Sequence, residues 1–111
     1  MSRYFLLITL LFLLSSCEEA RRDTFYSDGK VKTTVPLVNE KKQGIEVTFY
    51  SNGKMQSEVT YSNGLKEGPA TEYYEDSTIQ AKYTHVANFI EGEVTRFHPN
   101  GQLAFQGTYS K

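Results

Sequence analysis

The sequence is short of several residue types, and each shortage narrows the possible functions. Its 111 residues include one cysteine, three prolines and no tryptophan, and the net charge is −1 from 12 basic and 13 acidic side chains. A single cysteine cannot form an internal disulfide, so no disulfide framework supports this chain. The balanced charge, without a stripe of Lys and Arg, argues against nucleic-acid binding, which needs clustered cations for the phosphates.

Aromatic residues and glycine are what the chain has in quantity. Eight tyrosines and seven phenylalanines make up 14% of the sequence, beside eight glycines. This mixture is typical of short strands joined by tight turns. A domain this small buries only a thin core, so we expect turns and the stacking of repeats to provide much of the stability.

The N-terminus is typical of a secretory leader. Arg3 precedes a ten-residue, largely apolar run from Phe5 to Leu14. As a helix, such a run spans about 15 Å, roughly half of a bilayer core, which is too short for a stable spanning helix but fits a signal peptide. We therefore predict a signal peptide over residues 1–16.

The end of this leader, Leu14-Ser15-Ser16-Cys17, resembles the bacterial lipobox. The resemblance implies that the leader is cut before Cys17 and that this cysteine is lipidated. Several acyl chains on one residue hold a protein on a membrane stably, because each buried methylene contributes about 0.8 kcal/mol. The alternative is an ordinary signal peptide followed by a free thiol.

Residues 17–24 are expected to form the lipidated cysteine and a short polar linker. Glu18 and Glu19 follow Cys17 directly, either as part of a solvated acidic linker or as a signal for export to the cell surface. The predicted location is the bacterial cell envelope, with the outer membrane favoured and surface exposure left open.

Residues 25–111 repeat with a step of 24 residues. Three columns keep this step: an aromatic pair, a glycine and an apolar residue. Their members are Phe25-Tyr26, Phe49-Tyr50, Tyr73-Tyr74 and Phe97-His98; Gly44, Gly68 and Gly92; and Val31, Met55, Ile79 and Leu103. Three columns at one step indicate a repeat architecture. We divide it into units 25–48, 49–72, 73–96 and 97–111.

Each unit is predicted to contain two strands joined by a tight turn, with Asx-Gly as the turn signal in units one, two and four. A two-residue type I′ turn would pair Tyr50 with Met55, whereas a three-residue type I turn with a G1 bulge would pair Phe49 with Met55. We favour the second, because Pro99 suits the first central position of a type I turn. The glycines expected to be structural are Gly29, Gly53, Gly101, Gly44, Gly68 and Gly92.

The third unit has Ser77 where the others have the turn glycine. A residue with a side chain is disfavoured at positive φ. We therefore expect this turn to be distorted, differently paired or more mobile than the other three.

The favoured register also predicts two faces. Val47, Phe49, Met55, Val59 and Tyr61 would share the apolar face, and Thr48, Tyr50, Gln56 and Glu58 the polar one. We expect one continuous thin core, made of Phe49, Met55, Val59, Tyr73, Ile79, Tyr83, Phe97 and Leu103.

The motifs at 49–54 (Phe-Tyr-Ser-Asn-Gly-Lys) and 63–68 (Asn-Gly-x-x-x-Gly) resemble the MORN-repeat variant found in many bacterial lipoproteins and in YwqK-family antitoxins. The resemblance covers residues 25–109. It implies an all-β fold: an elongated, single-layer antiparallel sheet of stacked β-hairpins. The chain departs from the pattern at Ser77, at Asn39-Glu40 and at Ala87-Asn88.

One column offers a candidate contact surface. Tyr26, Tyr50, Tyr74 and His98 recur at the same step and would lie on the more polar face. Such aromatics are suited to contact a partner. The alternative is that they pack on neighbouring side chains and stabilise the sheet.

The remaining candidates indicate no catalysis and no metal. His85 and His98 are the two histidines and have no neighbouring Cys or His to complete a zinc site, and Glu91 and Glu93 are expected to be an exposed pair in a loop. No nucleophilic triad, P-loop or dinucleotide motif is present. We expect no enzymatic activity and no cofactor.

Three functions remain, in decreasing order of support. The first is an exported, membrane-anchored, non-catalytic protein-interaction or scaffold module, whose partners are the membrane, through lipid on Cys17, and another envelope protein. The second is an antitoxin-like inhibitor of an exported toxin, which only the family resemblance implies. A cell-envelope enzyme ranks last.

Overall fold

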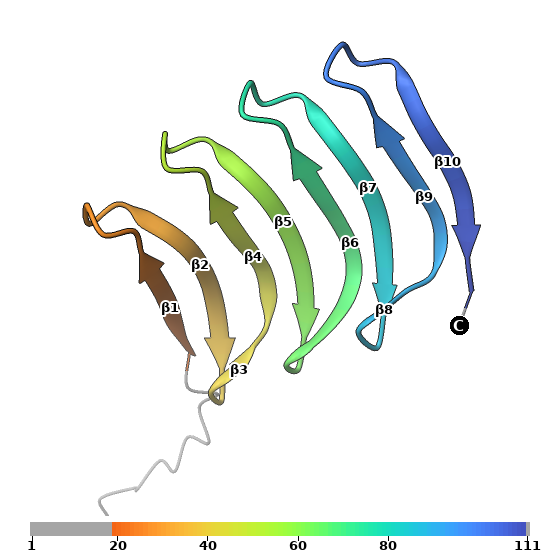
Figure 1. Cartoon of the computed structure of the whole chain (residues 1–111). Helices are drawn as coiled ribbons and strands as arrows, with labels where there is room; N and C mark the ends of the chain where they lie inside the picture. Colours follow the sequence, from red (N-terminus) through yellow and green to blue (C-terminus); the bar gives the residue numbers. More distant parts are fainter. Residues whose placement is uncertain (1–18, 111) are drawn as a thin grey trace, which may run out of the picture.

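The computed structural model describes residues 19–110, which form one open sheet (Figure 1). The main strands cross the sheet in chain order, in the sequence β1-β2-β4-β5-β6-β7-β9-β10, and the short β3 and β8 pair with β2 and β7. Every pairing is antiparallel. The predicted all-β, single-layer sheet of hairpins is confirmed. The strands are β1 (Glu19–Phe25), β2 (Val31–Val38), β3 (Lys41–Lys42), β4 (Gly44–Phe49), β5 (Met55–Ser62), β6 (Leu65–Tyr73), β7 (Ile79–Val86), β8 (Phe89–Ile90), β9 (Gly92–Phe97) and β10 (Leu103–Tyr109).

The segment expected to be a polar linker is instead a strand. Residues 19–24 lie in β1, which pairs with β2 from Glu19 opposite Val38 to Phe25 opposite Val31. Its charged side chains are exposed, as is common for strands at the edge of a sheet. The hairpins are therefore β1–β2, β4–β5, β6–β7 and β9–β10, and the first one begins before residue 25. The predicted signal peptide and Cys17 lie outside the described residues.

The turn within each hairpin is the type I turn with a G1 bulge. Phe49 pairs with Met55, as the favoured register predicted. Gly53 has a φ of 85°, and its N–H donates to the carbonyl of Tyr50 at 2.9 Å. The corresponding N–H groups of Gly29 and Gly101 donate in the same way, to Tyr26 and His98. These glycines are structural because the bulge requires positive φ.

The third turn is neither distorted nor differently paired, contrary to two of the three expectations for it. Ser77 has a φ of 73°, and its N–H donates to the carbonyl of Tyr74 at 2.9 Å, as the glycines do. Tyr73 pairs with Ile79 in the usual register. The carboxylate of Asp76 accepts both the N–H of Thr78, at 3.0 Å, and its hydroxyl, at 2.6 Å. The hydrogen bond from the Thr78 hydroxyl helps to hold this turn, in which a serine at positive φ is disfavoured.

The second glycine column marks a bend in the strands. Gly44, Gly68 and Gly92 have φ values of 110°, 115° and 82°. At Gly68, β6 contains two residues more than β5 between the pairs Tyr61–Lys66 and Val59–Ala70. A Cβ on Gly68 would lie 3.2 Å from a methyl group of Thr60. Glycine is therefore needed at this bend both for its φ and for space.

Successive hairpins are joined by two-residue turns, for which positive φ at both positions is typical of type I′. Asn63-Gly64 has φ values of 54° and 86°. Asn39-Glu40 (50° and 67°) and Ala87-Asn88 (47° and 75°) adopt the same conformation without glycine. The departures from the repeat pattern in the sequence therefore leave the turn unchanged.

The predicted apolar face is wrong because a bulge shifts the register. Phe49 pairs with Met55, but Thr48 pairs with Ser57, so β5 holds one extra residue. Beyond it, Val59 lies opposite Glu46, and Val59 and Tyr61 therefore point to the other face from Val47 and Phe49. A one-residue shift moves every following side chain to the other face.

The side chains that are buried form a different core from the one predicted. They are Val35, Leu37, Ala70, Ala81, His85 and Val94. The strand register places them on one side of the sheet together with Val59 and Tyr83; we call this side the buried face. Of the predicted members, Phe49 and Phe97 are only half-buried and Leu103 is 55% exposed.

Candidate interaction surface

The tyrosine column ties neighbouring hairpins together. The hydroxyl of Tyr26 donates to the carbonyl of Phe49 at 2.6 Å, and Tyr50 donates in the same way to Tyr73. Tyr74 donates to the carbonyl of Phe97 at 2.7 Å. Each bond crosses from one hairpin to the next, and all three rings are half-buried. The stabilising role is therefore present, while contact between these rings and a partner stays a prediction.

His98 ends this column and differs from the tyrosines. It is exposed, and its backbone makes the usual turn bonds to Gln102 and Gly101. It lies in the last hairpin, β9–β10, which has no following hairpin among the described residues. Its ring is therefore the member of the column that is most accessible to a partner.

The side of the sheet opposite the buried face is rich in threonine. The register from Thr34 through Val47, Glu58, Thr71 and Lys82 to Thr95 places these side chains on that side. Thr60 and Thr84 lie on it too, because alternate residues of a strand share a face. We call it the threonine face. Its side chains are half-buried or exposed, so it is open to solvent.

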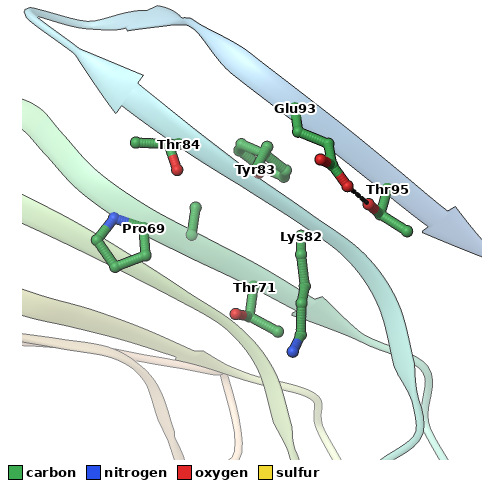
Figure 2. A pocket seen from close by; sticks show the side chains of 8 residues that line it. Pro69, Thr71, Lys82, Tyr83, Thr84, Glu93 and Thr95 are labelled. Atoms are coloured by element: carbon green, nitrogen blue, oxygen red, sulfur yellow. Dashed lines mark hydrogen bonds between the residues drawn. The ribbon is translucent and has the colours of Figure 1, made fainter. Parts of the chain in front are cut away.

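A shallow hollow of about 360 Å³ lies on the threonine face (Figure 2). It extends across β6, β7 and β9, and the side chains that border it include Pro69, Thr71, Lys82, Thr84, Glu93 and Thr95. Hydroxyl groups, one ammonium and one carboxylate are thus presented side by side. Such a surface can donate and accept hydrogen bonds and supply both charges to a polar partner.

Glu93 is held in place within this hollow. Its Oε1 accepts a hydrogen bond from the amide of Gln106 at 2.5 Å and a longer one from the hydroxyl of Thr95 at 3.4 Å. The residue lies in β9. The expectation of a loop position for Glu93 is therefore wrong, although its side chain is exposed as expected. Glu91 precedes β9 at the bend and is half-buried.

His85 is the buried polar side chain of the buried face, at 5% exposure. Its ring lies 5.3 Å from that of Tyr83 in an edge-on arrangement, and its Nδ1 has no hydrogen-bond partner in the protein. Burial, helped by the nearby charge of Lys66, lowers the pKa of His85, so the neutral ring is favoured. Burial and the neighbouring Glu72 raise the pKa of Tyr83 to about 12.

Sequence reasoning missed the role of Lys42. Its Nζ lies 2.6 Å from a carboxylate oxygen of Glu46 and 4.7 Å from the ring centre of Tyr61. Burial alone would lower the pKa of Lys42, but the hydrogen bond and charge of Glu46 outweigh it and raise the pKa. The spacing of four residues could not reveal this pair, because the strand bends between them at Gly44.

The described residues 19–110 contain no cluster of three or more His, Cys, Asp or Glu side chains that could hold a metal ion. Within the same range, no helix has the length and apolar character to cross a membrane.

Comparison with known proteins gives one match. The family model described as the MORN repeat variant matches residues 42–63, 66–87 and 90–111, which together make up more than half of the chain. The matches cover the hairpins β4–β5, β6–β7 (apart from Leu65) and β9–β10, and the unmatched hairpin β1–β2 has the same turn geometry. No curated protein and no solved structure matches the chain. The repeats and the hairpin geometry lead to one conclusion: this chain belongs to the MORN repeat variant family.

Proposed function

We propose that this protein is an exported lipoprotein that acts as a non-catalytic interaction or scaffold module on a bacterial membrane. The observation that carries the proposal is the open, single-layer sheet. Its threonine face is accessible across all hairpins, and tyrosine hydroxyls tie each hairpin to the next. A rigid, extended surface of this kind suits protein binding.

The anchor rests on the sequence alone. Cys17 ends the lipobox-like segment and precedes the first residue of β1 by two positions. A lipid on this residue would keep the start of the sheet close to the membrane. Replacing Cys17 by alanine should release the protein from the membrane fraction and abolish labelling with palmitate. Retention of both properties would contradict the anchor.

The threonine face is the surface that we expect a partner to contact. The hollow offers fixed polar groups, since Glu93 is held by Gln106 and the threonines are set on paired strands. Arginine at Thr84, an exposed position in this hollow, should therefore prevent binding by its bulk and charge. Ser51, which is exposed in a turn, provides the matched control.

The test is co-purification from detergent-solubilised membranes with the full, tagged protein. Proteins recovered with wild type and with Ser51→Arg, but lost with Thr84→Arg, would support the proposal. Equal recovery with Thr84→Arg would show that the threonine face does not bind. Recovery of an exported toxin that the protein inhibits would favour the antitoxin-like alternative, and hydrolysis of envelope material by the purified protein would contradict a non-catalytic role.

A further inference from the structure

The two strands at the ends of the sheet differ in character. β1 and β10 are the first and last in the strand order. β1 carries the charged residues Glu19, Arg21, Arg22 and Asp23, whereas β10 carries no charged residue and exposes Leu103, Phe105 and Tyr109. Charge on an edge strand discourages random pairing, and an uncharged, apolar edge invites a partner strand. The edge of β10 is therefore the place where a further strand would add.

The contacts between hairpins define which strand fits this edge. Three times along the chain, the second strand of one hairpin pairs with the first strand of the next, always at the same step of the repeat. The equivalent pairs are Thr34–Val47, Glu58–Thr71 and Lys82–Thr95. Gln106 of β10 lies one repeat after Lys82, and Asp23 of β1 lies one repeat before Val47. The same pairing would therefore place Gln106 opposite Asp23. A second copy of this chain thus offers the matching strand.

The tyrosine ties extend to the same partner. Tyr26, Tyr50 and Tyr74 each donate to a carbonyl 23 residues further along, in the next hairpin. His98 stands at the next position of the donor column and is exposed. The carbonyl of Phe25 stands at the first position of the acceptor column, and Phe25 is 58% exposed. The ring of His98 would therefore face the Phe25 carbonyl of a neighbouring copy.

The side chains that this register brings together are compatible. The amide of Gln106 would face the carboxylate of Asp23. Arg22 would face Gly107, whose surface is covered by the ring of Phe105, since a Cβ at Gly107 would lie 2.6 Å from that ring. A guanidinium beside an aromatic ring is favourable, and contacts of this type already occur where Lys32 lies over Tyr26 and Lys42 over Tyr61.

We infer that copies of this chain join head to tail, with β10 of one copy pairing with β1 of the next to continue the sheet. A heterologous contact of this kind gives a linear assembly unless its rotation closes a ring. Around Gln106 and Asp23, each junction would repeat the register that the chain already builds three times within itself. The edge of β10 would be covered by β1 of the next copy, with Gln106 opposite Asp23.

Membrane attachment distinguishes this arrangement from two-fold pairing of β10 with β10, and this step rests on the proposed anchor at Cys17. Glu19 pairs with Val38, next to the two-residue turns, so the chain enters the sheet along the border where those turns lie (Figure 1). Head-to-tail copies keep this border on one side, where all anchors reach one membrane. A two-fold axis would place the second anchor at the opposite border.

Disulfide trapping in native membranes tests the inference on the full chain. Directly opposed residues of antiparallel strands have Cα atoms close enough for a disulfide. The double variant Gln106→Cys/Asp23→Cys should give, on mild oxidation, a reducible ladder of dimers, trimers and larger species. The control Gln106→Cys/Arg22→Cys shifts the register by one residue and places the thiols on opposite faces, so it should give no ladder.

The single variants and palmitate labelling separate the possible failures. Palmitate label without a ladder in the double variant would overturn head-to-tail pairing while leaving the anchor intact. A dimer formed by Gln106→Cys alone, without higher species, would indicate two-fold pairing and also overturn it. A ladder in protein that takes no palmitate would support the pairing and contradict the anchor.

Discussion

Ala81 and Phe105 occupy the same position in consecutive repeats, but their surroundings differ. Ala81, on β7, is completely buried between β6 and β9, whereas Phe105, on the last strand, is exposed. The same step relates Tyr74, whose hydroxyl reaches the next hairpin, to His98, which is exposed. Residues one repeat apart therefore share a backbone conformation but not the same burial. Each hairpin of a single-layer stack is covered only by its neighbours, so burial depends on whether a neighbour is present.

The last hairpin of the described residues covers its outer strand in a different way from the others. On β7, the small Ala81 accompanies the large Tyr83, while on β10 the large Phe105 accompanies Gly107. The Phe105 ring lies over Gly107, at the position that corresponds to Tyr83. The large and the small residue have thus changed places between two neighbouring positions of the buried face. The aromatic ring of Phe105 covers this face at the end of the sheet.

The largest expected effect contrasts a buried side chain of the interior with an exposed one at the end. Val94 is 2% exposed and Leu103 is 55% exposed. Val94→Ala should lower the free energy of unfolding by about 2 kcal/mol, whereas Leu103→Ala should change it by less than about 0.5 kcal/mol. Urea unfolding followed by circular dichroism measures both. Equal losses in the free energy of unfolding would show that the difference in burial between these two side chains does not affect stability.

A smaller contrast concerns the ties between hairpins. Tyr50→Phe removes the hydroxyl that donates to the Tyr73 carbonyl at 2.6 Å, and a net loss of about 1 kcal/mol is typical for such a bond. His98→Phe, at the end of the same column, should leave the stability of dilute, monomeric protein unchanged. Thermal melts of both variants provide the measurement, and a neutral Tyr50→Phe would show that the ties do not stabilise the stack.

The turns allow a comparison of glycine with serine at one position of the repeat. Gly53 has a φ of 85° and Ser77 a φ of 73°. Gly53→Ala should cost about 1 kcal/mol, because a Cβ is disfavoured at positive φ. Ser77→Gly should raise the melting temperature or leave it unchanged, since it relieves that penalty and keeps the Asp76 contacts. The contrast would fail if Ser77→Gly were as destabilising as Gly53→Ala.

The hairpins and their turns were predictable because their signals are local. An Asx-Gly pair between two alternating strands indicates the turn, and Pro99 in the fourth unit favours the register in which Phe49 pairs with Met55. The backbone N–H bond to an Asx side chain occurs in all four turns. The prediction for the turn at Ser77 fails because the hydroxyl of Thr78 adds a second bond to Asp76, which the glycine pattern does not reveal.

The core was not predictable from alternation alone. The extra residue opposite Phe49 reverses the faces within β5, and the sequence does not mark which residue is bulged. The charges of β1 are typical both of an edge strand and of a linker, so the sequence does not distinguish the two. The threonine face was missed because its members belong to different columns of the repeat and come together only through the register of the strands.

The last prediction separates the two histidines by pH. His85 is buried and its pKa is lowered by burial, with Lys66 adding to the effect. The unfolded chain, in which the histidine has a pKa of about 6.5, therefore binds a proton more readily than the folded protein does. The contribution of the neutral ring is fully present above that pH, and stability should fall as the pH drops below it toward the lower pKa of the folded state.

The variant His85→Tyr should abolish this fall between about pH 7 and pH 5. It introduces the residue that the chain has one repeat before and one repeat after His85, at Tyr61 and Tyr109. His98→Tyr should leave the fall in place. Melting temperatures of the three proteins across this range make the comparison, and a fall that persists unchanged in His85→Tyr would assign the pH dependence to other groups.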